Sequence, residues 1–169
     1  MSQKLVILRG PAASGKTTIC EQVRDYDKKI VWLSVDKMKP IFSDFEDRTL
    51  EESNKAALAE LKYLLGEGYS VIFDGIFKNV NRVYEAIKIA KEKNIETLVY
   101  QLRCSLETLQ GRDKVRPGVK EGYRKPLGDK IIQSIHNTNL ENPIEGAIEL
   151  NTEEKSLDNC LEIIRSNFD

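Results

Sequence analysis

Two glycines, a lysine and two threonines follow a short apolar run near the start of the chain, in the stretch LRGPAASGKTTIC. Glycines let the backbone bend where a side chain would obstruct it, so successive N–H groups can converge on one phosphate chain. The spacing, Gly-x-x-x-x-Gly-Lys-Thr, is typical of a loop that binds nucleotide phosphates. The residues that we expect to contact the nucleotide are Gly10, Pro11, Ala12, Ala13, Ser14, Gly15, Lys16, Thr17 and Thr18.

Lys16 and Thr17 have separate predicted roles in this loop. Lys16 would act catalytically by placing its charge on the β- and γ-phosphates, and the hydroxyl group of Thr17 is a ligand for Mg²⁺. A helix that begins near Lys16 would add unpaired N–H groups and the positive end of its dipole. A chance match in a turn rich in glycine and serine is the alternative. The motif lies between an apolar run and a helical pattern, so we expect ATP and Mg²⁺ as cofactors.

Two aspartates each follow an apolar run that is typical of a strand. We predict that Asp36 accepts the proton of an attacking hydroxyl group, a role that contributes roughly 10²–10⁴-fold to a rate. Asp74 would orient water on Mg²⁺ or hold the acceptor. A structural role is the alternative for both, because Asp36 suits a helix cap or turn and Asp74 suits a turn before Gly75.

A basic segment near position 120 provides candidates for closing the site. Arg112 and Arg116 are four residues apart, so on a helix they share a face that suits a phosphoryl group in transfer. Pairing with Glu107 or Asp113 on a solvated helix is the alternative. The stretch 112–130, RDKVRPGVKEGYRKPLGDK, lacks apolar periodicity. We interpret it as a lid whose cations reach the phosphates, with a solvated surface loop as the alternative.

The composition limits the classes of protein to which the chain can belong. Its 26 basic and 27 acidic residues nearly balance, which argues against a protein dedicated to coating nucleic acid. The three cysteines have no metal or redox spacing, which favours a reducing, cytoplasmic location. The apolar run at residues 5–8 is too short for a signal peptide or a membrane span. The length of 169 residues suits a single domain over 1–169.

Hydrophobic periodicity predicts the elements that position these residues. We expect strands at 4–8, 30–35, 70–73, 97–102 and 147–150, and helices at 16 to about 26, 49–66, around 83–90, 105 to about 115, 131–140 and around 157–164. Strands that alternate with helices indicate a parallel sheet covered on both faces, with ligands beyond the carboxyl ends of the strands. The glycine loop, Asp36 and Asp74 all follow strands, so they would meet there.

These residues resemble those of the small P-loop kinases, in GPAASGKTT, Asp36, VIFD and RDKVR. That group includes polynucleotide 5′-hydroxyl kinases, zeta-toxin kinases, chloramphenicol phosphotransferase and gluconate kinase. The resemblance extends from Lys4 to about Leu150. It implies a P-loop NTPase-type α/β three-layer sandwich with a five-stranded parallel sheet, ATP with Mg²⁺, Asp36 as the base, and Arg112 or Arg116 in a lid.

The acceptor is less sharply defined by the sequence. Polynucleotide kinases carry an arginine three positions after the catalytic aspartate, where this chain has Lys39. Lys39 is a candidate contact for the acceptor because a lysine attracts a phosphate, but it cannot form a bidentate fork. A small metabolite, drug or nucleoside is therefore favoured over a nucleic-acid end. Arg82 is a further candidate for contacting the acceptor, or else a surface arginine.

Two other functions stay open at this stage. A nucleoside monophosphate kinase would need several arginines around its anionic acceptor, and Arg48 and Arg82 are available. A nucleotide-binding regulatory switch would show slow hydrolysis without an acceptor. The chain lacks a clear Asn-Lys-x-Asp motif for reading guanine, which argues against a GTPase.

Overall fold

The computed structural model describes residues 2–42, 47–116 and 125–168. The middle of the predicted lid, residues 117–124, lies outside the described residues, and so does the side chain of Arg48. None of the described helices is long and apolar enough to cross a membrane.

The described residues form one five-stranded sheet with the order β2-β3-β1-β4-β5, in which every neighbouring pair of strands is parallel. This confirms the predicted sheet. The strands are β1 (Lys4–Arg9), β2 (Ile30–Ser34), β3 (Ser70–Gly75), β4 (Glu96–Arg103) and β5 (Ile148–Asn151).

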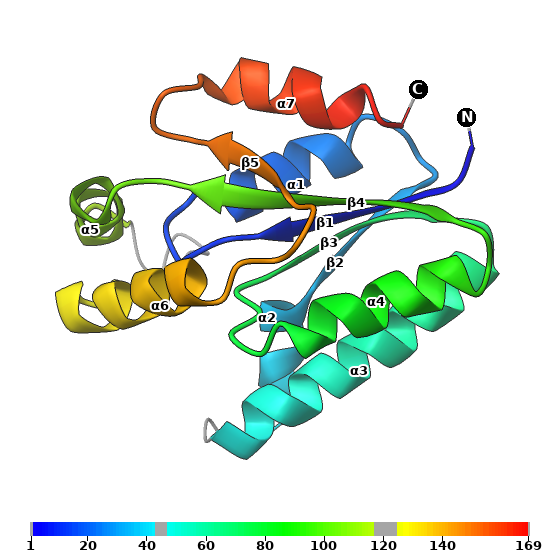
Figure 1. The fold of residues 1–169 in the computed structure, drawn as a ribbon, viewed down its shortest axis with the longest axis horizontal. Helices are drawn as coiled ribbons and strands as arrows, with labels where there is room; N and C mark the ends of the chain where they lie inside the picture. The colour runs from blue at the N-terminus through cyan, green and yellow to red at the C-terminus, as the bar shows by residue number, and fades with distance from the viewer. Residues whose placement is uncertain (1, 43–46, 117–124, 169) are drawn as a thin grey trace.

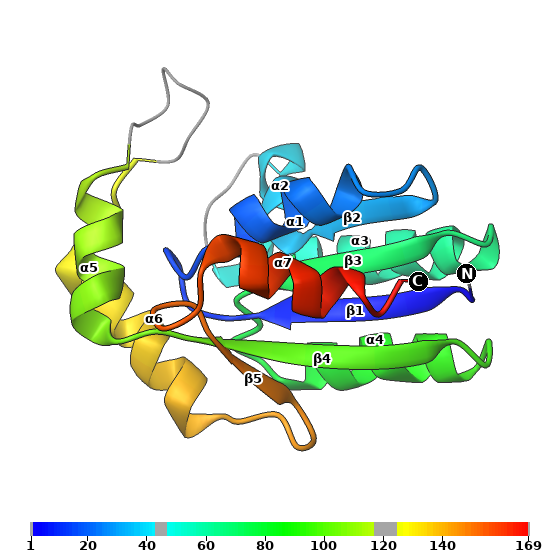
Figure 2. The ribbon, with the colours of Figure 1, turned by 90° about the horizontal axis from the view of Figure 1, so that it is seen from above.

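Helices cover both faces of the sheet, so the molecule has three layers (Figures 1 and 2). On one face, α1 (Lys16–Arg24) and α7 (Leu157–Arg165) pack against Val6 and Leu8 of β1. On the other face, α3 (Asp47–Gly66) and α4 (Asn81–Lys91) pack against Leu5 and Ile7. Successive residues of a strand point to opposite faces, so the continuous apolar run of β1 serves both cores.

The remaining helices lie near the carboxyl ends of the strands. They are α2 (Val35–Met38), the short 3₁₀ helix η1 (Lys39–Ile41), α5 (Leu106–Lys114) and α6 (Asp129–Glu141). Figure 1 shows α5 and α6 beyond the ends of β4 and β5. Ser105 caps α5, as the sequence predicts, because its side chain accepts a hydrogen bond from the N–H group of Thr108.

One boundary differs from the sequence prediction in a way that affects the site. The second strand ends at Ser34 rather than at Val35, so Asp36 lies in the first turn of α2 and not at the end of a strand. Val35 continues the apolar run but packs into the core from this helical turn. The periodicity of a run of apolar residues does not distinguish a strand from a single buried turn of helix.

We expect the helix α3 to contribute strongly to stability through its buried face. Leu61 is fully buried, whereas Tyr63 on the same helix is 64% exposed. Truncating Leu61→Ala should therefore lower the free energy of unfolding by about 2–5 kcal/mol. The matched change Tyr63→Ala should cost less than about 0.5 kcal/mol. Chemical denaturation of both variants checks this, and equal losses would contradict the assignment of the core face.

Candidate functional site

The glycine loop connects the central strand β1 to the helix α1, and its geometry depends on two glycines in different ways. A Cβ atom on Gly10 would lie 2.9 Å from both the Cβ atom of Leu102 and the Oγ atom of Ser14, so no side chain fits there. A Cβ atom on Gly15 would meet nothing within 4 Å, but its φ of 92° is left-handed. Gly15 occupies the cap position of α1 and has no side chain with which to satisfy the first N–H groups of the helix. The amides at the start of α1 can therefore bind an anion.

Lys16 lies inside this loop and is almost fully buried. Its Nζ atom donates hydrogen bonds to the carbonyl oxygens of Gly10 and Pro11, each over 2.8 Å. Burial lowers the pKa of Lys16, and the charges of Asp74 and Asp36 act in the opposite direction. Both aspartates are therefore close enough to influence the ammonium group, as the convergence predicted from sequence requires.

Asp36 projects from the first turn of α2 and is paired with Lys39. The Nζ atom of Lys39 lies 2.5 Å from Oδ1 of Asp36, and both side chains are largely buried. The residue proposed from sequence as the base and the residue proposed as an acceptor ligand therefore contact each other. An acceptor with an anionic group would compete with Asp36 for Lys39.

Asp74 is the penultimate residue of β3, and only 3% of its surface is exposed. Its Oδ1 atom accepts a hydrogen bond of 2.7 Å from Nε1 of Trp32, and the side chain of Ser34 also bonds to it. Burial raises the pKa of Asp74, while the charge of Lys16 and these two hydrogen bonds lower it. The carboxylate is thus held at the end of the strand adjacent to β1.

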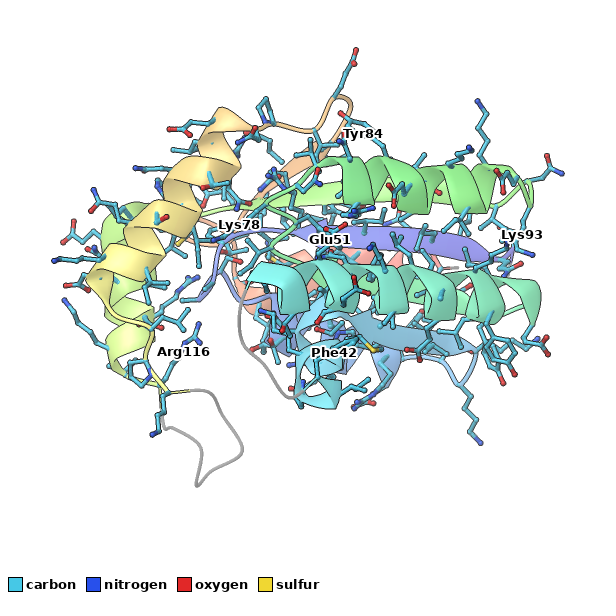
Figure 3. All side chains as sticks on the ribbon, turned by 90° about the horizontal axis from the view of Figure 1, so that it is seen from below. Phe42, Glu51, Lys78, Tyr84, Lys93 and Arg116 are labelled. Atoms are coloured by element: carbon cyan, nitrogen blue, oxygen red, sulfur yellow. The ribbon has the colours of Figure 1, made fainter. Side chains whose placement is uncertain are left out.

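Arg116, one of the two arginines predicted to serve the lid, lies just after α5. Its charge contributes to lowering the pKa of Lys16 in the glycine loop. Its Nε atom lies 3.1 Å from Oδ1 of Asp113. Figure 3 shows Arg116 beside α5 and Phe42 beside α2, on opposite sides of the edge where the strands end. Arg116 can therefore approach a ligand from the side opposite α2.

Asp113 is a functional candidate that the sequence suggested only as a salt-bridge partner. Its carboxylate is almost fully buried, and its Oδ2 atom accepts hydrogen bonds from the N–H groups of Leu127 and Gly128, at 2.8 and 2.9 Å. One carboxylate thus joins the end of α5 to the residues before α6. It determines where both described ends of the predicted lid lie.

Arg112 and Arg82 make contacts that tie them to the scaffold. Arg112 donates from Nη2 to the carbonyl oxygen of Thr152, over 2.8 Å, in the segment after β5. Arg82 pairs with Glu51 of α3 and Glu85 of α4, so it joins these two helices. Two described parts of the 112–130 stretch are helical, because α5 continues to Lys114 and α6 begins at Asp129. The predicted lid is therefore shorter than the sequence suggested.

A buried arginine lies directly before the glycine loop. Arg9 has no exposed surface, and its Nη1 atom donates a hydrogen bond of 2.7 Å to Oε1 of Gln101. Its Nε atom donates to the carbonyl oxygen of Phe77, whose φ of 46° is left-handed. Burial lowers the pKa of Arg9 to about 10, and the charge of Arg103 contributes in the same direction. A buried positive charge therefore lies at the end of β1, directly before the glycine loop.

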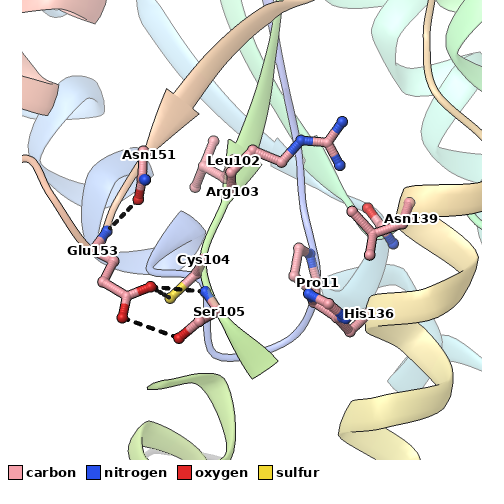
Figure 4. A pocket seen from close by; sticks show the side chains of 10 residues that line it. Pro11, Leu102, Arg103, Cys104, Ser105, His136, Asn139, Asn151 and Glu153 are labelled. Carbon is pink, nitrogen blue, oxygen red and sulfur yellow. Dashed lines mark hydrogen bonds between the residues drawn. The ribbon is translucent and has the colours of Figure 1, made fainter. Parts of the chain in front are cut away.

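A pocket of about 320 Å³ opens beside the loop, between α6 and the ends of β4 and β5 (Figure 4). Pro11, Ser105, His136 and Glu153 are among its lining residues. Glu153 accepts hydrogen bonds from the N–H and hydroxyl groups of Ser105, at 2.8 and 3.0 Å. Residue type and spacing indicate neither His136 nor Glu153 as a site residue, because only the fold brings these distant segments together.

The chemistry of the available oxygen donors determines which metal this site suits. Among the described residues there is no cluster of three His, Cys, Asp or Glu side chains that could hold a metal ion. Mg²⁺ differs from metals held in all-protein cages, since it keeps several waters and uses one or two protein ligands together with phosphates. The exposed hydroxyl group of Thr17 and the carboxylate of Asp74 fit that requirement.

Comparisons with known proteins are consistent with this geometry. A family model described as an AAA domain matches residues 5–133. No curated protein matches the chain. Many solved structures have similar folds, among them three at low sequence identity. A gluconokinase from Sinorhizobium meliloti is 14% identical with a TM-score of 0.66, covering 98% of this chain and 95% of its own.

The other two structures come from different kinds of complexes. The Mycobacterium tuberculosis APS kinase in complex with AMPPNP and APS is 16% identical with a TM-score of 0.70, covering 99% of this chain and 98% of its own. A chain of the Pnkp1/Rnl/Hen1 RNA repair complex is 20% identical with a TM-score of 0.68, covering 83% of this chain and 45% of its own. At these identities the likeness establishes the fold alone.

We expect Asp113 to hold the two ends of the lid together. In Asp113→Ala the amides of Leu127 and Gly128 lose charge-assisted hydrogen bonds worth about 1.5–3 kcal/mol, so their hydrogen exchange should accelerate about 10–100-fold. The control Lys114→Ala removes an exposed pair with Asp129 and should leave both rates nearly unchanged. Exchange rates at Leu127 and Gly128 that do not change in Asp113→Ala would rule out this role.

Proposed function

Since the chain belongs to the AAA domain family and has the fold of the small P-loop kinases, we propose that it transfers the γ-phosphoryl group of ATP to a hydroxyl group. One observation carries the proposal. Lys16 and Asp36 follow β1 and β2, and Asp74 is the penultimate residue of β3 between them, so three adjacent strands supply these groups. Both carboxylates act electrostatically on the lysine. Ligands of open parallel sheets bind beyond the carboxyl ends of the strands.

In this proposal the glycine loop binds the triphosphate. The amides at the start of α1 donate to phosphate oxygens, and the dipole of the helix favours their negative charge. The ammonium group of Lys16 exchanges its bonds to the carbonyl oxygens of Gly10 and Pro11 for bonds to phosphate. Thr17 is the residue that would hold Mg²⁺, and Asp74 would orient a water on it. When bound, the metal would neutralise charge on the β- and γ-phosphates.

Asp36 is the proposed general base for the acceptor. It would accept the proton of the hydroxyl group while that oxygen attacks the γ-phosphorus. Lys39, which pairs with Asp36, would move toward an anionic group of the acceptor if the acceptor carries one. Arg116 would stabilise the charge that spreads over the phosphoryl group in transfer, whereas Arg112 is held by Thr152 and would act from the side of β5.

The alternative functions differ in which acceptor supports release of ADP. A nucleoside monophosphate kinase needs free arginines, but Arg82 is paired with Glu51 and Glu85. A coupled ADP assay across nucleoside monophosphates, nucleic-acid 5′-hydroxyl ends and neutral alcohols would separate the acceptors. A regulatory switch would release ADP slowly whether or not an acceptor is present.

We expect Asp36→Asn to lower phosphoryl transfer by about 10²–10⁴-fold, because the amide cannot accept the proton. Binding of an ATP analogue, measured by calorimetry, should be nearly unchanged. Asp25→Asn is the matched control, since Asp25 is an exposed aspartate paired with Arg24 at the end of α1 opposite the glycine loop. Normal turnover by Asp36→Asn would show that another group acts as the base.

We expect Gly10→Ala to weaken binding of the magnesium complex of ATP at least about tenfold. The added Cβ atom would contact Leu102 and Ser14 too closely, and overpacking of this kind distorts the backbone at a cost of about 1–3 kcal/mol. Gly111→Ala on α5 is the control, because a Cβ atom there meets nothing within 4 Å. Calorimetry on both variants tests the loop, and equal affinities would argue against phosphate binding by it.

A further inference from the structure

Trp32, the single tryptophan of the chain, connects three parts of the candidate site. It lies on β2, an edge strand of the sheet, and is partly buried against the core on the α1 face. Its indole N–H group donates to Asp74 over 2.7 Å. A buried indole N–H group generally needs a hydrogen-bond partner, and here the partner is a carboxylate of the candidate site.

Ser34 supports the same carboxylate from the same strand. Residues two apart on a strand share a face, so Trp32 and Ser34 both approach Asp74 from β2. Ser34 is also the register partner of Asp74 in the sheet. Two donors from one rigid strand therefore fix the orientation of a planar carboxylate, and they also favour its charged form against the effect of burial.

The π-face of the indole ring contacts cations from two helices, Lys37 of α2 and Arg24 of α1. The Nζ atom of Lys37 lies 3.3 Å from the centroid of the ring, and the guanidinium group of Arg24 lies 5.9 Å from it. A cation over the face of tryptophan is attracted by the negative charge of that face. Lys37 is adjacent to Asp36 in the sequence, so this contact also fixes the turn that carries the proposed base.

We propose that Trp32 is a positioning residue, whose N–H group orients Asp74 toward a magnesium-bound water and whose ring holds α2 in place through Lys37. This inference rests on the proposed function. The indole thus connects the carboxylate that serves the metal to the helix that carries the base. Groups that orient a metal-site carboxylate typically change metal affinity by about 10–100-fold when they are removed.

The variants separate the two contacts of the indole. Trp32→Phe keeps an aromatic ring and removes the donor to Asp74. Ser34→Ala removes the other donor with little change in volume, and it serves as the second variant if Trp32→Phe folds poorly. Lys37→Met removes the cation over the ring and leaves the indole N–H group in place.

The main readout is binding rather than turnover. Calorimetry measures the affinity for a non-hydrolysable ATP analogue at increasing concentrations of Mg²⁺. The midpoint is the magnesium concentration at which half of the total increase in affinity is reached. We expect this midpoint to rise about tenfold in Trp32→Phe and less in Ser34→Ala, with the metal-free affinity for the analogue unchanged. In Asp74→Asn the further change Trp32→Phe should no longer move the midpoint. Lys37→Met should leave the midpoint unchanged and lower the rate of transfer.

The outcomes distinguish failure of this inference from failure of the proposed function. If the unaltered protein does not bind the analogue with or without magnesium, the proposed function is wrong and this inference falls with it. The other case is that the unaltered protein binds the analogue with a clear magnesium midpoint. If Trp32→Phe then has the same midpoint, and circular dichroism shows that the variant is folded, only the role of Trp32 is wrong. A shift of equal size in the Asp74→Asn background would likewise overturn it, since the effect would not pass through the carboxylate.

Discussion

The buried ammonium group of Lys16 is the interaction on which the site depends. Neutral carbonyl oxygens of its own loop hold it, while the charges of Asp74 and Asp36 act against the lowering of its pKa by burial. In a site that excludes water, an ammonium group interacts more strongly with a charged partner than with a neutral carbonyl oxygen. Lys16 therefore holds the loop through its own carbonyl groups, and in the proposed function these bonds to neutral oxygens would be replaced by stronger bonds to a charged phosphate.

The sequence predicted the parallel sheet and the loop because those features depend on local patterns. Short apolar runs between helical periods indicate strands, and the glycine spacing indicates a phosphate loop regardless of what lies further away. The same reasoning placed Asp36 at the end of a strand, whereas it lies on the short helix α2. A single helical turn is too short to produce a periodic signal, and tertiary packing of Val35 decides its conformation.

What the sequence could not predict depends on contacts between residues far apart in the chain. Arg82 looked available for an acceptor, but Glu51 from another helix pairs with it. Asp113 looked like an ordinary surface acid, but it is buried and receives two backbone N–H groups. The donation from Trp32 to Asp74 joins neighbouring strands whose order is a property of the fold. Residue type and spacing carry no signal for any of these pairings.

The guanidinium group of Arg9 has a wider consequence than its hydrogen bonds. With a pKa of about 10 it stays charged throughout the physiological range, and its full burial keeps mobile ions away from it. Salt screens exposed charges over about 10 Å but screens buried ones much less. Its field therefore acts on groups inside the protein at the base of the glycine loop, and this internal interaction depends little on ionic strength.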